Sequence, residues 1–218
     1  MKKFILILIA LFIIGLIAFS YYTRPAPLPS TDTDTATATS SDAYVVSQDE
    51  SSAEFRIDEV LNGSPFTAIG TTNAIYGEFK LVDEGGIKTP ELSEFKINAR
   101  TLKTDNENRD GAIARLILKS DKPENEFITF KPIDVIGAPD NFIYGEEYTF
   151  QVLGDMTISG ITKQVTFDIT SKATEQEAQV EAHALIKRSD FNLVIPNIPF
   201  VASVENEFEI NASLVAKK

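Results

Sequence analysis

Alternation of apolar and polar residues with a period of two dominates the chain from residue 43 onward. Residues 93–101 read SEFKINART, which places Phe95, Ile97 and Ala99 on one face of an extended strand. The same alternation recurs in Ile75/Gly77/Phe79/Leu81, Tyr148/Phe150/Val152, Val165/Phe167/Ile169, Val180/Ala182/Ala184/Ile186 and Val204/Phe208/Ile210/Ala212/Leu214. The pattern is typical of half-buried strands, and we expect about eight or nine of them.

Turn sequences separate the expected strands, and glycine in them supplies the positive φ that tight hairpins need. They are Asn62-Gly63, Glu84-Gly85-Gly86, Gly145 and Ser159-Gly160. Many antiparallel strands with short turns indicate a closed barrel or a two-layer sandwich, because a long open sheet exposes aggregation-prone edges. We predict an all-β domain, a closed antiparallel β-barrel of about eight strands.

One stretch breaks the alternation. Residues 109–119 read RDGAIARLILK and place Ile113, Leu116 and Ile117 at helical spacing. We therefore expect one short helix that crosses outside the sheet and closes an end of the barrel.

An apolar segment occupies the beginning of the chain. The twenty uncharged residues 4–23 cover roughly 30 Å as a helix, the thickness of a bilayer's hydrocarbon core. Because Lys2 and Lys3 precede them, residues 1–24 are predicted to form a single-pass transmembrane anchor with a cytoplasmic N-terminus and an exported remainder. The alternative is a signal peptide cleaved near Ser20, although the apolar run is longer than such peptides usually have.

The next segment, residues 25–42, holds three prolines, eight serines or threonines and no aromatic residue. Such a composition buries too little apolar surface to fold, so we predict a disordered linker. Residues 43–218 then form a single domain.

The composition excludes several kinds of chemistry. With no cysteine and one histidine, the chain cannot form a disulfide, a thiolate zinc site or a multi-histidine metal site. A net charge of −12 disfavours binding to nucleic acid. No Gly-x-Ser-x-Gly elbow, phosphate loop or metal-spaced cluster occurs, so we predict no catalytic residue, no metal and no cofactor.

The inward-facing residues mix large and small side chains. An eight-stranded barrel either packs solid or encloses one small ligand, and small inward residues favour a cavity. The predicted apolar lumen consists of Phe55, Ile57, Phe79, Phe95, Ile97, Phe150, Val152, Phe167, Ile169, Ala182, Ala184, Phe208 and Ile210. A structural or adhesion module with a solid core stays open as an alternative, and an enzyme using lumenal carboxylates is a weaker one.

Four segments bear a likeness to a known family. Residues 154–169, GDMTISGITKQVTFDI, resemble the signature hairpin of the YceI-like, polyisoprenoid-binding family. Residues 104–110 (TDNENRD), 127–130 (FITF) and 186–191 (IKRSDF) resemble further family segments in the same order. The resemblance implies an extracytoplasmic, lipocalin-like barrel whose partner is a long isoprenoid or another lipid, with residues 4–23 in the membrane.

Two departures from the family pattern concern the barrel mouth and a loop. Residues 62–76 form a longer segment without the histidine that many members carry, and Asn125-Glu126 replaces a usual Tyr-Pro. Four polar residues are candidates for either a headgroup contact at the mouth or a structural role: Arg109, Asp110, Arg188 and Asp190.

Overall fold

The computed structural model describes residues 42–196 and 201–218. The predicted anchor, residues 1–24, and nearly all of the predicted linker lie outside the described residues. Within the described part, no helix has the length and apolar character needed to cross a bilayer.

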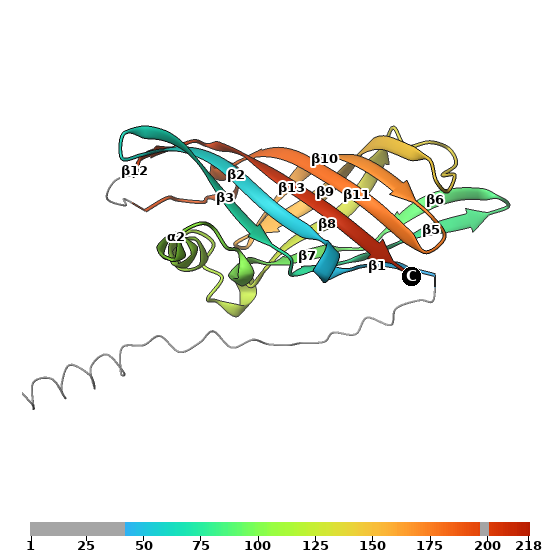
Figure 1. The fold of residues 1–218 in the computed structure, drawn as a ribbon, viewed down its shortest axis with the longest axis horizontal. Coiled ribbons are helices and arrows are strands. Elements are labelled where there is room, and N and C mark those ends of the chain that lie inside the picture. Colours follow the sequence, from blue (N-terminus) through green and yellow to red (C-terminus); the bar gives the residue numbers. More distant parts are fainter. Residues whose placement is uncertain (1–41, 197–200) are drawn as a thin grey trace, which may run out of the picture. The chain divides into compact units, whose positions relative to one another are not determined.

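The described residues fold into thirteen strands, one α-helix and several shorter helical turns (Figure 1). The strands are β1 (Tyr44–Val46), β2 (Ser52–Leu61), β3 (Ser64–Thr72), β4 (Ile75–Tyr76), β5 (Glu78–Glu84), β6 (Ile87–Leu92), β7 (Phe95–Asn98), β8 (Phe127–Ile136), β9 (Glu147–Ile158), β10 (Ile161–Ala173), β11 (Glu177–Lys187), β12 (Val201–Val204) and β13 (Glu207–Lys217). The helical elements are α2 (Glu107–Ala112), the π-helical η3 (Ile113–Ile117) and the 3₁₀ turns η1 (Gln48–Glu50), η2 (Ala99–Thr101), η4 (Pro123–Asn125) and η5 (Arg188–Phe191).

All the strands belong to one antiparallel sheet. Its main path runs β4-β7-β8-β9-β10-β11-β13-β1-β5-β6, and β2 joins it from the side by pairing with β13, β3 and β12. Strand β13 pairs with β2 through residues 209–213 and with β1 through residues 216–217, while β11 lines its other edge throughout. The sheet therefore divides into two branches along β13.

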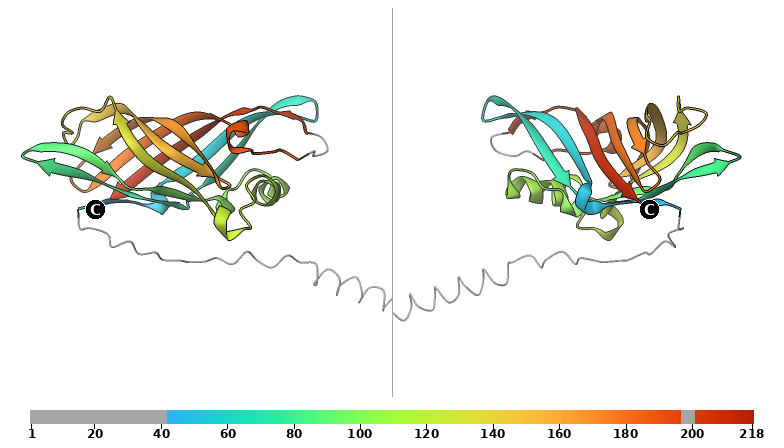
Figure 2. Two further views of the ribbon diagram at one scale, coloured as in Figure 1. Left: turned by 180° about the vertical axis from the view of Figure 1, so that it is seen from behind. Right: turned by 45° about the vertical axis from the view of Figure 1, so that its right-hand side comes forward.

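The prediction of an all-β antiparallel fold is confirmed, but the prediction of a closed barrel is wrong. The sheet curls into a half-barrel (Figure 2), and its path ends, β4 and β6, do not pair with each other. The sheet stays open because it branches at β13. Strands β2 and β3 form one branch, and β1, β5 and β6 form the other. Strand pairing near β1 is short. Strand β1 pairs with β5, and β4 pairs with β7, through two residues each. The Val46 amide also donates a hydrogen bond of 3.0 Å to the Gly77 carbonyl.

More strands form than the alternation predicts, because bends divide several alternating segments. Residues 75–81 are one alternating segment in the sequence, yet the chain pairs with β7 before Gly77 and with β1 after it. The predicted turns have the expected backbone: Asn62 and Gly63 have φ of 51° and 77°, and Ser159 and Gly160 have φ of 50° and 77°.

The single helix predicted over residues 109–119 is confirmed as α2 followed by η3. The Asn106 side chain caps α2 by accepting hydrogen bonds from the amides of Asn108 and Arg109. Ile113 and Leu118 are buried in the main core, so this segment packs on the half-barrel with its apolar side inward.

An ion pair secures the loop that follows the helix. Glu126, which stands in the family's Tyr-Pro position, lies 3.1 Å from the Arg100 guanidinium, and both side chains are about one-tenth exposed or less. This departure from the family pattern has a structural role.

Candidate functional site

Two apolar cavities lie inside the curled sheet, and we call them cavity 1 and cavity 2. Cavity 1 has a volume of about 160 Å³ and is lined mainly from β5, β7, β8, β9, β10, β11 and β13. Cavity 2 has a volume of about 660 Å³ and lies between β2, the α2–η3 segment, residues 193–196 and β13. Cavity 2 is within the usual size range of small-molecule sites.

The two cavities adjoin. Four apolar residues line both of them: Ile97, Ile128, Met156 and Ile210. We call these residues the waist. Met156 is the most adaptable of them, because its unbranched thioether side chain has three rotatable bonds.

Nearly all of the predicted lumen residues line these cavities. Cavity 1 is lined by Phe79, Phe95, Phe150, Val152, Phe167, Ile169 and Ala182. Cavity 2 is lined by Phe55, Ile57 and Phe208, and Ile97 and Ile210 line both. Ala184 lines neither cavity and is buried in the main core instead. Contact of these residues with a ligand stays a prediction.

Several lining residues come from segments without alternation. Cavity 1 is completed by residues 142–144, and cavity 2 by Leu116, Leu193, Ile195 and Pro196. Strand periodicity carries no signal for such positions, since loops and helices bring them to the cavity.

An ion pair that the sequence pattern did not single out lies on the wall of cavity 2. The Arg109 guanidinium donates to a carboxylate oxygen of Glu59 at 3.1 Å, and the two side chains are 18% and 8% exposed. Arg109 also pairs with Asp105 and lies 5.0 Å from the centre of the Phe66 ring. The alternation of Phe55 and Ile57 extends to Glu59, so the inward position of this carboxylate was available from the sequence.

Asp110 has a structural role and does not pair with Arg109. It accepts hydrogen bonds of 2.7 Å from the Thr104 amide and the Thr104 hydroxyl, and Lys103 lies 3.5 Å away. Burial acts to raise the pKa of Asp110, but the bonds from Thr104 and the charge of Lys103 outweigh it and hold the pKa below its ordinary value.

The other two polar candidates, Arg188 and Asp190, differ in their surroundings. The Arg188 guanidinium donates to the backbone carbonyls of Glu205, Leu193 and Val204 at 2.7, 3.0 and 3.0 Å, which fixes the segments beside cavity 2. Asp190 is exposed and does not line either cavity. Of the four candidates, Arg109 is therefore the one whose charged group lies on the cavity wall with a carboxylate partner.

A curled antiparallel sheet around adjoining apolar cavities defines this chain as an all-β cavity protein. Residues 44–216 match the family model described as YceI-like domain, and the chain belongs to that family. No curated protein matches the sequence.

Two solved structures share the fold. A polyisoprenoid binding domain from Saccharophagus degradans, implicated in plant cell wall breakdown, aligns with a TM-score of 0.62 and 12% identity, covering 80% of this chain and 97% of that one. BcnA from Burkholderia cenocepacia aligns with a TM-score of 0.60 and 18% identity, covering 79% and 99%. At these identities the likeness concerns the fold.

Proposed function

We propose that this chain is a membrane-anchored extracytoplasmic protein that sequesters or transfers a polyisoprenoid or a similar long apolar molecule. The observation that carries the proposal is the pair of adjoining apolar cavities in a YceI-like fold. The polyisoprenoid binding described for the Saccharophagus degradans domain supports this ligand class.

Burial of a hydrocarbon tail supplies the binding free energy. At about 0.8 kcal/mol per methylene, a tail of roughly 20 carbons gains on the order of 16 kcal/mol relative to water, before entropy costs. Because the alternative environment for such a tail is the bilayer, binding is effective only close to a membrane. Residues 4–23 as an anchor and residues 25–42 as a tether would keep the domain there.

The polar end of the ligand would lie in cavity 2. Its wall carries Arg109 and Glu59, and the exposed side chains of Asn62, Asn106 and Asn108 complete a polar rim. Cavity 1 would take the far end of the tail, because its lining is almost wholly apolar.

A solid-core structural or adhesion module fits these observations less well. A core that served only stability would be close-packed, whereas cavity 2 alone has a volume of about 660 Å³. We also propose binding in place of catalysis, because the inward carboxylate Glu59 is already held by Arg109.

Lipid extraction tests the proposal. The full chain, purified from membranes, is extracted with organic solvent beside Ala182→Trp, which fills cavity 1, and Gln179→Trp, an exposed control on the same strand. Mass spectrometry should find one apolar molecule per chain in the wild type and in Gln179→Trp, and much less in Ala182→Trp. The same lipid content in all three extracts would show that cavity 1 does not hold the lipid.

A further inference from the structure

Each cavity reaches the surface at an exposed apolar residue of its own lining. In cavity 2 this residue is Leu116, 55% exposed, and in cavity 1 it is Ile143, 59% exposed. Leu116 belongs to η3, whereas Ile143 follows Phe142, whose amide donates to the Lys88 carbonyl of β6. We call the opening of cavity 2 at Leu116 the cap mouth, and the opening of cavity 1 at Ile143 the hairpin mouth. Figure 1 shows α2 and the β5–β6 hairpin near opposite ends of the half-barrel.

Both mouths carry a second exposed apolar side chain. At the cap mouth it is Val194, 72% exposed, which lies between the cavity-lining residues Leu193 and Ile195. At the hairpin mouth it is Ile87, 53% exposed, next to Lys88. Apolar exposure alone therefore does not distinguish the two mouths.

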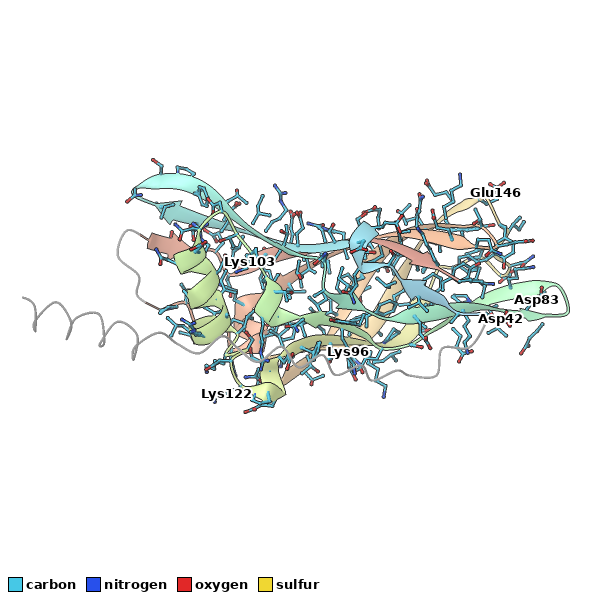
Figure 3. All side chains as sticks on the ribbon, turned by 60° about the horizontal axis from the view of Figure 1, so that its bottom comes forward. Asp42, Asp83, Lys96, Lys103, Lys122 and Glu146 are labelled. Atoms are coloured by element: carbon cyan, nitrogen blue, oxygen red, sulfur yellow. The ribbon has the colours of Figure 1, made fainter. Side chains whose placement is uncertain are left out.

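Charge distinguishes them clearly. Residues 113–124 at the cap mouth hold three cations and two carboxylates. Residues 83–91 and 140–147 at the hairpin mouth hold six carboxylates and one lysine. Figure 3 shows Lys122 near the helix, and Asp83 and Glu146 at the other end of the domain. Residues 113–124 thus carry a net charge of +1 in a chain of net charge −12, while the helix α2 before them carries −1.

The cations of the cap mouth are also available to an external partner. Among the described residues, Arg115, Lys119 and Lys122 are exposed and no carboxylate forms an ion pair with them. The single lysine of the hairpin mouth, Lys88, is by contrast paired with Asp83 at 3.0 Å.

We propose that the cap mouth docks on the surface of an anionic lipid bilayer. Leu116 and Val194 enter the interfacial region, and the free cations of residues 115–122 contact lipid phosphates. The acidic hairpin mouth is repelled from the same surface. Docking in this orientation builds on the proposed lipid role, since it lets an apolar molecule pass between the bilayer and cavity 2 without crossing water.

Site-specific fluorescence tests the orientation, and the absence of cysteine from the chain makes single labels possible. The full chain carrying Leu116→Cys or Ile143→Cys is labelled with an environment-sensitive nitrobenzoxadiazole dye. Each is reconstituted into vesicles of phosphatidylcholine alone or with phosphatidylglycerol. Both variants share the same N-terminal segment, so any difference between them reports on the folded domain.

The expected result is a blue shift and a severalfold rise in emission for the label at Leu116 in phosphatidylglycerol vesicles, with quenching by spin-labelled headgroups. The label at Ile143 should stay in water. High salt, or Arg115→Gln, Lys119→Gln and Lys122→Gln together, should abolish the signal at Leu116.

A matched control neutralises three exposed lysines elsewhere, Lys131, Lys163 and Lys172, and should leave the signal at Leu116 unchanged. A label at Leu116 that stays in water on anionic vesicles, or equal shifts at both mouths, would overturn the docking proposal. The labels report position without requiring a bound lipid, so this failure is distinguishable from a failure of lipid binding.

Discussion

At the scale of single residues, glycine makes room for aromatic rings that line the cavities. A Cβ atom on Gly154 would lie 2.5 Å from Cζ of Phe130 and 2.7 Å from the carbonyl oxygen of Lys131. The ring could move only at the expense of cavity 1, which it lines, and the carbonyl belongs to strand β8. Gly154 opens the hairpin motif by which the sequence resembles its family, and this contact gives a physical reason for glycine there.

Gly154→Ala should lower the free energy of unfolding by about 1–3 kcal/mol, because the added methyl group overpacks the sheet against β8. Gly111→Ala in α2 is the control, since nothing lies within 4 Å of its Cβ position and alanine favours the helix. Chemical denaturation of both variants measures the difference. Equal stability of the two variants would contradict this account of Gly154.

Asp110 predicts a dependence of stability on pH. Its native pKa lies below the ordinary value because the hydrogen bonds from Thr104 outweigh burial. A carboxyl group with a lowered native pKa stabilises the fold above its unfolded pKa, and this contribution is lost as the pH falls through the native pKa.

Asp110→Asn should therefore flatten the loss of stability between about pH 5 and pH 2, while lowering stability at neutral pH. Denaturant midpoints measured across this range provide the test. A variant with the same acid slope as the wild type would show that Asp110 does not contribute to it.

At the scale of elements, the Arg109–Glu59 ion pair joins α2 to β2 at the wall of cavity 2. Arg109→Ala should destabilise the fold by about 1–3 kcal/mol, because it leaves a nearly buried carboxylate without its partner. The matched control is Arg56→Ala on β2, the strand that carries Glu59. Arg56 is 42% exposed and lies 3.5 Å from Glu54, so its loss should cost at most about 1 kcal/mol.

A double-mutant cycle with Glu59→Gln separates the ion pair from the other contacts of Arg109. Thermal or chemical unfolding of the three variants gives the coupling. Additive effects of Arg109→Ala and Glu59→Gln would contradict a direct interaction.

The strands and the helix could be predicted because their patterns are local. The alternation of Phe150, Val152 and Met156 in β9 follows from the pleat, and the turn at Ser159-Gly160 follows from its glycine. The branching of the sheet could not be predicted, since it depends on which half of β13 meets β2 and which meets β1. The part of the cavity 2 wall formed by Leu193, Ile195 and Pro196 could not be predicted either, because these residues lie outside any strand or helix pattern.

At the scale of the whole molecule, two cavities with different surroundings meet at the waist. Cavity 1 opens beside a strongly acidic surface, and cavity 2 opens beside free cations and the Arg109–Glu59 pair. In the proposed orientation on the bilayer, a lipid with a polar end would enter tail first through the cap mouth. Cysteine is absent and the one histidine, His183, is exposed, which suits a protein that encloses an apolar molecule.

The central claim is that the cavities bind one long apolar molecule, and native mass spectrometry tests it most directly. The delipidated full chain is titrated with a polyprenol and compared with Ala182→Trp and the exposed control Gln179→Trp. We predict a single 1:1 adduct for the wild type and for Gln179→Trp. Binding by Ala182→Trp should be at least about tenfold weaker, because the loss of only two methylene contacts in the filled cavity already has an effect of that size. A wild-type chain that forms no adduct, or an Ala182→Trp variant that binds as tightly as the wild type, would contradict the claim.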